Sequence, residues 1–426
     1  MTTKEQEAII RLIEREVVPA IGCTEPVAVA LAAAKTKEIL GDIPEKILVY
    51  LSTNMLKNTM GVGIPGTGMI GLPIAVALGV LIGKSEYRLE VLKETYPKAV
   101  ASAKKFVDEK RIRILHKPDA PNKLYIEVIG CRGEDTVKVI ISGSHSHFSL
   151  ISKNNSILFE EAPEIEEKPA EETPQLDFRK VYDFAMNTPF RKLSFILRTV
   201  ELNRKAAETA LKGHYGHELG KTIHGLHRRD FFGRSLYAKI LSFTSAACDA
   251  RMAGAQIPVM SNSGSGNQGI VATLPVWVYA HRKKVRRELL IRALTLSHLS
   301  VIYIKQSFGR LSPLCGCVVA ATGSACGLTY LMGGNYQQIT YAVKNMIANI
   351  TGMLCDGAKP SCSLKVSTGV STAVFSAILA MEDKFVTASE GIIDNDVDQC
   401  IRNLVSIGTQ GMQDTDRCIL DIMTRK

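Results

Sequence analysis

The sequence predicts an α+β protein: an N-terminal mixed α/β domain with a largely antiparallel sheet, and a larger all-helical C-terminal domain. Short runs with alternating apolar residues are concentrated in the first 160 residues, which is typical of strands. The segment 160–174 is rich in Glu and Pro, as linkers often are. Beyond it, the apolar residues recur with a helical period. We therefore expect one domain over residues 1–165 and a second over 175–426.

The N-terminal part is expected to begin with two helices. Residues Lys4–Val17 carry apolar side chains on one side and end before Pro19, and Val27–Ile39 is an alanine-rich run. A further amphipathic helix is expected at Pro97–Glu109. Short turns separate the strand-like runs, so neighbouring strands should pair antiparallel. These runs lie at residues 47–51, 111–115, 124–129, 137–141, 148–151 and 157–159.

The C-terminal part is expected to be almost wholly helical and to carry the cysteines discussed below. An apolar run over Cys317–Leu331 predicts one of its helices. Other helices are expected to begin near residues 177, 191, 235, 286, 340 and 368.

The composition is that of an ordinary globular protein. The chain has 426 residues, of which 46% are apolar and 22% charged, and this length suits two domains. It has ten cysteines and a polar start without the apolar run of a signal peptide, which favours a reducing cytoplasm over a disulfide-forming compartment. We therefore expect a cytoplasmic protein whose cysteines are not paired in disulfides.

The formal net charge is +10, and basic runs lie at residues 228–229 and 281–287. No aromatic residues interleave with these runs, so solvated helix ends explain them better than nucleic-acid binding does. A mild positive field also suits a small carboxylate substrate. We expect no nucleic-acid partner, and a homodimer remains open.

The uncharged run Thr59–Gly83 is long enough to cross a membrane. Glycines and prolines break its first half, and such a backbone could not satisfy its hydrogen bonds in lipid. A buried loop followed by a buried helix is expected instead, with no membrane partner. Gly61, Gly63 and Gly66 match Gly-x-Gly-x-x-Gly, but Pro65 interrupts the motif and no βαβ unit surrounds it.

This glycine-rich loop is expected to approach a small ligand or another loop closely with its backbone. Lys57 and Asn58 lie directly before the loop and could supply hydrogen-bond donors to such a ligand. Solvation at the surface is the alternative for both side chains.

The stretch from Cys315 to Cys362 contains the strongest indication of a metal centre. Cys355 and Cys362 are seven positions apart and share a polar Gly/Pro loop, which can direct two thiolates at one point. Cys315 can join them from a separate element. Three thiolates at one centre are typical of iron–sulfur chemistry, and an iron without a protein ligand is a Lewis acid that can bind substrate. The alternative is that these cysteines are buried apolar filler.

Two neighbouring cysteines are expected to be dispensable for such a centre. Pro313 ends any earlier helix and leaves Cys315 on a turn at the start of the next one. Cys317 follows two positions later and points to roughly the opposite side. Cys326 is about three helical turns along, which places its sulfur more than about 10 Å away. Cys317 in place of Cys315 remains the alternative.

A donor-rich loop at residues 261–269, Ser-Asn-Ser-Gly-Ser-Gly-Asn-Gln-Gly, lies between two apolar helices. Backbone N–H groups together with Ser and Asn side chains can cradle a carboxylate, and an arginine can clamp the same group with two hydrogen bonds. A plain linker is the alternative. The expected substrate-binding residues are Asn58, Arg251, Ser263, Gly264, Asn267 and Gln268.

Three further features are candidates for chemistry. Cys23 lies at a helix start, where a lowered pKa would make its thiol a base or nucleophile, unless it is simply buried there. His145, in the run 143–147 at a strand end, is a candidate acid or base, or one of a surface pair. The His-x-x-His pairs at residues 214–217 and 224–227 have zinc-like spacing but no cysteines nearby, so zinc is not expected.

Several of these motifs occur in the same order in one enzyme family. The chain closely resembles, over nearly its whole length, the L-cysteine desulfidases, which are relatives of the iron–sulfur L-serine dehydratase α chain. The motifs that carry the resemblance are Ile21-Gly22-Cys23-Thr24-Glu25-Pro26, Asn54-x-x-Lys57-Asn58, Ile64-Pro65-Gly66-Thr67-Gly68-Met69, the loop 261–269, and Gly352-Met353-Leu354-Cys355-Asp356-Gly357-Ala358 with Cys362.

The resemblance implies an oxygen-sensitive [4Fe–4S] cluster on three cysteines, whose positions match Cys315, Cys355 and Cys362. The reactive N-terminal cysteine of the family matches Cys23. The Gly-x-His-Thr-Asn signature of the family is altered here to Gly-Ser-His-Ser-His at residues 143–147, in which His145 takes the histidine place. With Lys57, these residues form the expected catalytic set.

The implied reaction is the α,β-elimination of L-cysteine to sulfide, ammonia and pyruvate, without pyridoxal phosphate. Dehydration of L-serine on the same scaffold is the rival enzymatic activity. A helical binding protein whose cysteines serve only in packing is the rival from another class. The fourth cluster ligand stays undetermined, because Cys317 and Cys326 stand where relatives often carry other small residues.

Overall fold

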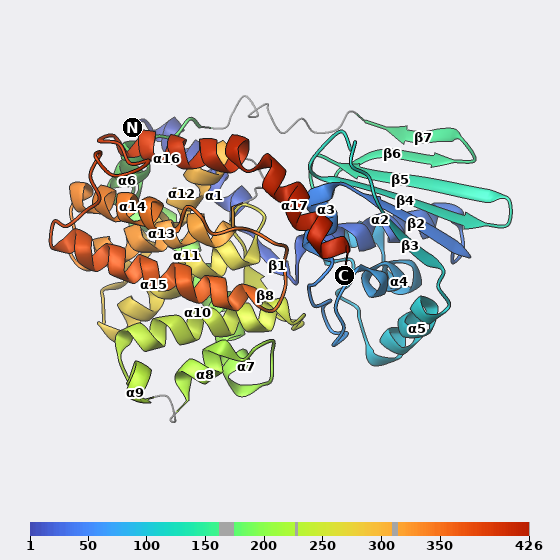
Figure 1. Cartoon of the computed structure of the whole chain (residues 1–426), viewed down its shortest axis with the longest axis horizontal. Helices are drawn as coiled ribbons and strands as arrows, with labels where there is room; N and C mark the ends of the chain where they lie inside the picture. The colour runs from blue at the N-terminus through green and yellow to red at the C-terminus, as the bar shows by residue number, and fades with distance from the viewer. Residues whose placement is uncertain (162–173, 226–228, 309–313, 426) are drawn as a thin grey trace.

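The computed structural model describes residues 1–161, 174–225, 229–308 and 314–425. A six-stranded sheet with its helices forms one part of the molecule, and a bundle of helices forms the other (Figure 1). This arrangement confirms the predicted α+β fold class. Most of the expected linker, residues 162–173, lies outside the described residues.

The sheet has the strand order β3-β2-β4-β5-β6-β7. Strands β2 and β3 pair parallel, and each other neighbouring pair is antiparallel, in agreement with the prediction of a largely antiparallel sheet. The strands are β2 (Lys46–Leu51), β3 (Ile112–His116), β4 (Tyr125–Arg132), β5 (Asp135–Ser142), β6 (Phe148–Lys153) and β7 (Ser156–Glu160).

Helices cover the sheet in two layers. Helix α2 (Thr24–Leu40) packs on β4 and β5, and α4 (Leu72–Ile82) packs on α2. Both helices are apolar around most of their circumference, as expected for helices inside a core. The amphipathic α5 (Pro97–Asp108) then covers α4 with its apolar side. The buried α4 is the helix that we expected in place of a membrane span.

Helix α13 (Gly316–Leu331) is central to the helical part and contacts α11, α12, α14 and α15. Nearly all of its residues are buried, because it carries small and apolar side chains on every side. The helices around it are α6 (Phe178–Asn187), α7 (Leu197–Lys212), α8 (Leu219–His224), α9 (Arg229–Phe232), α10 (Leu236–Met252), α11 (Gly266–Arg282), α12 (Arg287–Phe308), α14 (Tyr336–Ile350), α15 (Cys362–Met381) and α16 (Val397–Ser406).

Two helices begin earlier than the sequence pattern predicts. Helix α14 starts at Tyr336 rather than near residue 340, because Asn335 and Gln338 form a capping box there. Helix α15 starts at Cys362 rather than near residue 368. Cys362 is therefore the first residue of a helix and not the end of a loop.

The N-terminal end of the chain packs on the helical part. Helix α1 (Thr3–Glu16) buries Ile9 and Ile13 in the same core as the C-terminal helices. Strand β1 (Pro19–Ile21) then pairs antiparallel with β8 (Pro258–Met260). The sequence analysis missed this two-stranded sheet, because three residues are too few to show a period. The division into domains 1–165 and 175–426 stays a prediction.

The C-terminal end crosses in the opposite direction. Helix α17 (Gln413–Thr424) lies against α3 (Thr53–Thr59) and buries Leu420 in the core beneath the sheet (Figure 1). Asp416 of α17 forms a buried ion pair with Lys57, with 2.6 Å between Nζ and Oδ1, and accepts a hydrogen bond from the amide of Asn54 at 2.9 Å. This polar contact joins positions more than 350 residues apart.

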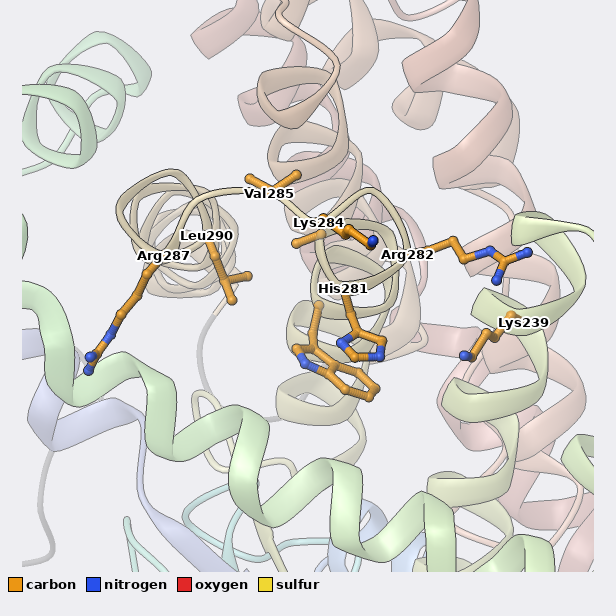
Figure 2. Close-up of a pocket in the computed structure, with 9 residues that line it drawn as sticks. Lys239, His281, Arg282, Lys284, Val285, Arg287 and Leu290 are labelled. Atoms are coloured by element: carbon orange, nitrogen blue, oxygen red, sulfur yellow. The ribbon is translucent and has the colours of Figure 1, made fainter.

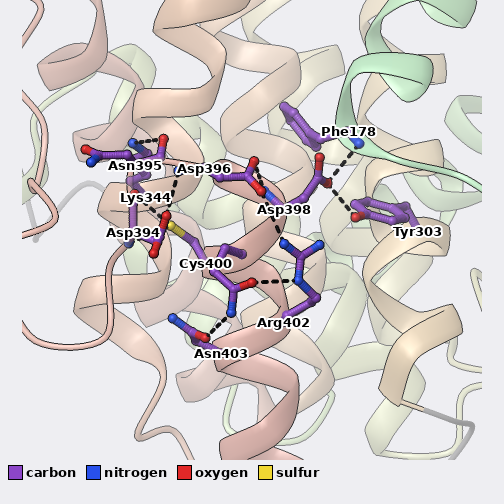
Figure 3. A network of polar contacts seen from close by, with 11 residues as sticks. Phe178, Tyr303, Lys344, Asp394, Asn395, Asp396, Asp398, Cys400, Arg402 and Asn403 are labelled. Carbon is purple, nitrogen blue, oxygen red and sulfur yellow. Dashed lines mark hydrogen bonds and ion pairs between the residues drawn. The ribbon is translucent and has the colours of Figure 1, made fainter.

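A polar network fixes the start of α16 to the first helix after the linker region (Figure 3). A carboxylate oxygen of Asp398 accepts hydrogen bonds from the backbone N–H of Phe178, at 2.9 Å, and from the hydroxyl of Tyr303, at 2.5 Å. Asp396, the N-cap of α16, pairs with Arg402 nearly two turns along the helix, at 3.2 Å. The network therefore ties α6, α12 and α16 together.

Helix α15 is the one helix in the described part of the chain that is long and apolar enough to cross a membrane by length and composition. It packs on α10, α13 and α14, and its outer side leaves Leu364, Phe375 and Ile378 exposed. A core helix passes the same test, so this observation is weak evidence for a membrane span. The expected cytoplasmic location and the homodimer stay predictions.

We predict that the Lys57–Asp416 pair contributes strongly to stability. Asp416→Asn should lower the free energy of unfolding by about 3 kcal/mol, because it leaves a buried ammonium without its counter-charge. Urea unfolding measures this loss. Asp414→Asn on the same helix is the matched control: Asp414 is 98% exposed, and its loose pair with Arg417 should contribute less than about 1 kcal/mol. Equal losses in both variants would contradict the prediction.

Candidate active site

Four segments that lie far apart in the sequence meet between the two parts of the molecule. The first is the start of α2 at Cys23, and the second is the end of α10 at Arg251, whose guanidinium interacts with the Cys23 thiol. The third is the loop 261–269, which lies against Arg251. The fourth is the segment before α15, whose Cys362 is close enough to affect Cys23 electrostatically. The predicted site residues on these segments are thus brought together.

Cys23 occupies the N-cap of α2 and is 1% exposed. Burial raises the pKa of its thiol to about 12, and the charge of Arg251 opposes this only in part. Of the two alternatives that the sequence left open, a lowered pKa at the helix start and a buried cysteine, the structure agrees with the buried cysteine. The physical reason is that moving a thiolate out of water costs more free energy than its interactions with the helix dipole and the guanidinium provide.

Arg251 is a buried cation without an ion-pair partner in the described part of the chain. Its side chain is on α10, the residue is 5% exposed, and no ion pair among the described residues includes it. Its Nε atom is buried without a hydrogen-bond partner in that part of the chain. Gly266 makes room for it, because a Cβ there would lie 2.3 Å from Nε. An uncompensated buried charge is costly, so the site is suited to an anion.

The loop 261–269 turns through Ser263 and Gly264, which both have positive φ, before α11 begins at Gly266. The first N–H groups of a helix have no partner within it and attract anions. Two amide oxygens of the loop, Asn267 Oδ1 and Gln268 Oε1, are buried without a partner among the described residues. The loop that carries these two orphan acceptors lies against Arg251 at Gly266.

Two buried side chains that sequence reasoning missed hold this loop. The amide of Asn203 donates to the backbone oxygen of Gly269 at 3.1 Å, and its oxygen accepts from the N–H of Met260 at 2.9 Å. His298 contacts the amide of Asn262 through Nδ1 and the hydroxyl of Thr273 through Nε2, both at 3.0 Å. Neither residue stands in a motif, so only the folded structure could identify them.

The three predicted cluster cysteines lie near one another. Cys315 is the N-cap of α13, and its N–H donates to the oxygen of Met353 at 2.9 Å. Leu314 and Leu354 form a β-bridge, which places Cys315 and Cys355 on adjacent segments. Cys355 and Cys362 both raise the pKa of the Cys315 thiol, which burial raises most. The Pro313 argument lies outside the described residues.

The segment between Cys355 and Cys362 is held by charges. Asp356 forms ion pairs with Lys359 and Lys365. Burial alone would raise the pKa of Asp356, but its hydrogen bonds to the two lysines outweigh burial and lower it to about 2. Gly357 has φ +88°, and a Cβ there would lie 2.3 Å from the backbone oxygen of Lys57. This position therefore requires glycine, and the loop packs directly on α3.

Three other cysteines, Cys317, Cys326 and Cys248, are buried and interact with residues outside the group of Cys315, Cys355 and Cys362. The thiol of Cys317 donates to the backbone oxygen of Lys365 at 3.3 Å, so it is directed at α15. Cys326 interacts with Ser300 of α12. Cys248 on α10, which the sequence analysis did not select, is fully buried, and Cys362 and Cys317 both affect its thiol. All ten cysteines of the chain are described, and all are free thiols.

A chain of hydrogen bonds links Asn58 to the loop 261–269. The Asn58 amide donates to Glu25 at 3.1 Å, and the Thr24 hydroxyl lies 3.1 Å from Glu25 and 3.3 Å from the backbone oxygen of Gly264. Asn58 is thus close to the start of α2 and Cys23. Glu25 belongs to the motif 21–26, but the sequence analysis assigned it no role of its own.

The structure places the other two expected catalytic residues differently. The ammonium of Lys57 is bound to Asp416 and is directed at α17. His145 is buried in the turn between β5 and β6, near the ends of the inner strands β4 and β5, where Ser142 pairs with Tyr125. The N–H of Ser52, the N-cap of α3, donates to the backbone oxygen of Tyr125 at the same end of the sheet. The catalytic roles of Lys57 and His145 stay predictions.

The glycine-rich loop approaches another loop rather than a nucleotide site. Gly63 N–H donates to the oxygen of Met252 at 2.9 Å, and Gly66 N–H donates to the oxygen of Gly254 at 3.1 Å. These contacts support the segment that follows Arg251. Among the described residues, no group of three His, Cys, Asp or Glu side chains already has a metal-holding arrangement. His227 of the second zinc-like pair lies outside them.

Comparisons with known proteins cover the whole chain. The family model described as serine dehydratase alpha chain matches residues 86–421, which include Arg251, Cys315, Cys355 and Cys362. A UPF0597 protein from Bacteroides fragilis is 63% identical over 426 residues, 100% of each chain. A UPF0597 protein from Phocaeicola vulgatus is 63% identical over 423 residues, 99% of this chain and 98% of that protein. One from Bacteroides thetaiotaomicron is 61% identical over 426 residues, 100% and 99%.

We predict that His298 makes the fold sensitive to acid. Burial lowers its pKa from 6.5 to about 3, so the unfolded chain binds a proton below pH 6.5 that the folded protein refuses. Stability should therefore fall as the pH drops through this window. His298 alone should account for a loss of about 2 kcal/mol between pH 7 and pH 5.

Urea unfolding at the two pH values measures this effect. His298→Gln should lose the His298 part of the pH dependence, whereas the exposed control His214→Gln should keep it. An unchanged pH dependence in His298→Gln would show that the buried imidazole does not titrate in this way.

Proposed function

Because the chain belongs to the serine dehydratase alpha chain family, we propose that it is a lyase that performs α,β-elimination on a small L-amino acid, with L-cysteine as its substrate. The observation that carries this proposal is the set of orphan polar atoms between Arg251 and the loop 261–269. The resemblance in sequence to L-cysteine desulfidases supports the choice of amino acid.

The orphan atoms complement a zwitterion. Arg251 Nε is a buried donor with a positive charge, which suits an α-carboxylate. Asn267 Oδ1 and Gln268 Oε1 are buried acceptors, which suit an α-ammonium. A free amino acid carries these two groups on one carbon, so one small molecule could satisfy all three atoms. Asn58, Ser263 and Gly264 would close the polar side of this site.

The thiols fit an iron–sulfur cluster in kind and in surroundings. Cys315, Cys355 and Cys362 are free, partly accessible and close enough to affect one another, and they would hold a [4Fe–4S] cluster. Lys365 is close enough to Cys315 and Cys355 to interact with them electrostatically. Its ammonium would therefore offset the negative charge of three thiolates. Such a cluster supplies a Lewis acid that withdraws electrons from the leaving group.

The protein side chains would orient the bonds that break. Elimination takes the proton from Cα, breaks the Cβ–S bond and forms a C=C bond between Cα and Cβ. The products are sulfide and aminoacrylate. Water then converts aminoacrylate to pyruvate and ammonia. Cys23 interacts with Arg251 and would lie near the carbon that bears the carboxylate, so we propose it as the candidate for proton or sulfur handling. His145 and Lys57 are secondary candidates.

L-Serine dehydration is the second candidate, and the description of the matched family favours it. A single anaerobic assay separates the two activities: sulfide and pyruvate are measured with L-cysteine, and pyruvate alone with L-serine. We expect kcat/KM to be higher for L-cysteine. A preference for L-serine would replace the substrate but keep the reaction class, and no pyruvate from either would contradict the proposal.

We predict that Arg251→Lys raises KM with little effect on stability. The lysine keeps the charge but loses the forked donors, so about tenfold weaker carboxylate binding is expected. Gly266→Ala is a companion variant that displaces the arginine without changing charge, and it should raise KM in the same direction. An unchanged KM in both would contradict the carboxylate assignment. Steady-state kinetics and thermal unfolding make the comparison.

We predict that the cluster depends on Cys315, Cys355 and Cys362. Single Cys→Ser variants at these positions, prepared without oxygen, should lose bound iron and activity. Cys326→Ser is the matched control in α13, because its thiol interacts with Ser300 away from the group, and it should keep both. Cys317→Ser should also keep its iron. Loss of iron in Cys317→Ser with retention in Cys315→Ser would exchange the two assignments.

A further inference from the structure

The basic run 281–287 lies at a surface hollow (Figure 2). It forms the turn between α11 and α12, and together with Lys239 of α10 this turn borders an open hollow with a volume of about 560 Å³. This volume is in the range of small-molecule sites. The hollow is lined by four cationic side chains, Lys239, Arg282, Lys284 and Arg287.

These cations have no counter-charges in the described structure. No acidic residue is among the described residues that line the hollow, and no ion pair in that part of the chain includes any of the four. The nearest acid in sequence, Glu288, is paired with Arg292 at 2.9 Å. The hollow therefore concentrates positive charge beyond what solvation of a helix end requires.

The floor of the hollow is aromatic and well packed. Trp277, the single tryptophan of the chain, stacks on His281 with 5.3 Å between ring centroids and 21° between planes. Phe243 packs on the indole at 5.8 Å. Trp277 is 9% exposed, while His281 faces the hollow in Figure 2. The cations thus surround a firm floor of defined shape.

We propose that this hollow is a binding site for a small organic phosphate with two or more negative charges. Arginine forks match phosphate oxygens in pairs, and the first turn of α12 at Arg287 adds backbone N–H groups that attract phosphate. Arg282 and Lys239 lie on one side of His281 in Figure 2 and Arg287 lies on the other, so the positive charge borders one hollow. A charge limited to one hollow favours a small ligand over a nucleic-acid backbone, which would need a longer basic track.

The hollow is separate from the candidate active site. Gly266 begins α11 beside Arg251, whereas His281 lies near the other end of the same helix, roughly 22 Å away along its axis. Likewise, Lys239 stands at the start of α10 and Arg251 at its end. The inference therefore does not depend on the proposed lyase activity.

Titration of the full-length protein with inorganic pyrophosphate by calorimetry tests this inference. We expect saturable binding that weakens as salt rises, and a Kd about tenfold or more higher for Arg282→Glu and for Arg287→Glu. Lys104→Glu, an exposed charge reversal on α5, is the matched control and should leave the Kd unchanged. All the altered side chains are exposed, and melting temperatures verify that the variants are folded.

Three results would overturn the inference. Wild-type protein could show no saturable binding at millimolar pyrophosphate. Lys104→Glu could weaken binding as much as the hollow variants do, which would indicate the general field of a basic protein. Citrate could bind more tightly than pyrophosphate, which would assign the hollow to carboxylates.

Discussion

The buried guanidinium of Arg251 is the constraint on which the arrangement of the site depends. A charged side chain that is 5% exposed and has no ion pair among the described residues is costly to maintain. Its neighbours are shaped around it: Gly266 leaves room for Nε, and the Cys23 thiol lies within its reach. Asn267 and Gln268, which follow Gly266 in the same loop, have acceptor oxygens without a partner among the described residues. Such a group is more readily explained by a ligand than by folding.

The crossing of the chain ends explains how this site is assembled. Helix α1 joins the helical core, and α17 returns to the sheet side, where Asp416 holds Lys57. Strand β1 brings the start of α2 to β8, directly before the loop 261–269. Gly357 packs on the backbone of Lys57 and so connects the cysteine segment to α3. The site therefore forms only when both parts are folded together.

The sequence was sufficient for the fold class, the strands of the six-stranded sheet and the residues that share a motif, because periodicity and donor-rich loops are local signals. It could not show which way a side chain is directed. Lys57 was expected to be able to donate to a ligand, yet its ammonium is paired with Asp416. No pattern in the sequence near Lys57 indicates this partner, because Asp416 lies near the other end of the chain. The sequence left open whether the pKa of Cys23 is lowered by the helix start or the thiol is buried, and burial, which depends on the whole fold, raises the pKa. Asn203 and His298 stabilise the loop from helices that carry no motif.

The most direct test of the account is an anaerobic crystal structure with a bound amino acid that reacts slowly. The account predicts a carboxylate oxygen within hydrogen-bond distance of Arg251 Nε, and an ammonium next to Asn267 and Gln268, with the side chain directed toward Cys315, Cys355 and Cys362. An amino acid bound elsewhere, with Arg251 Nε still lacking a partner, would contradict it.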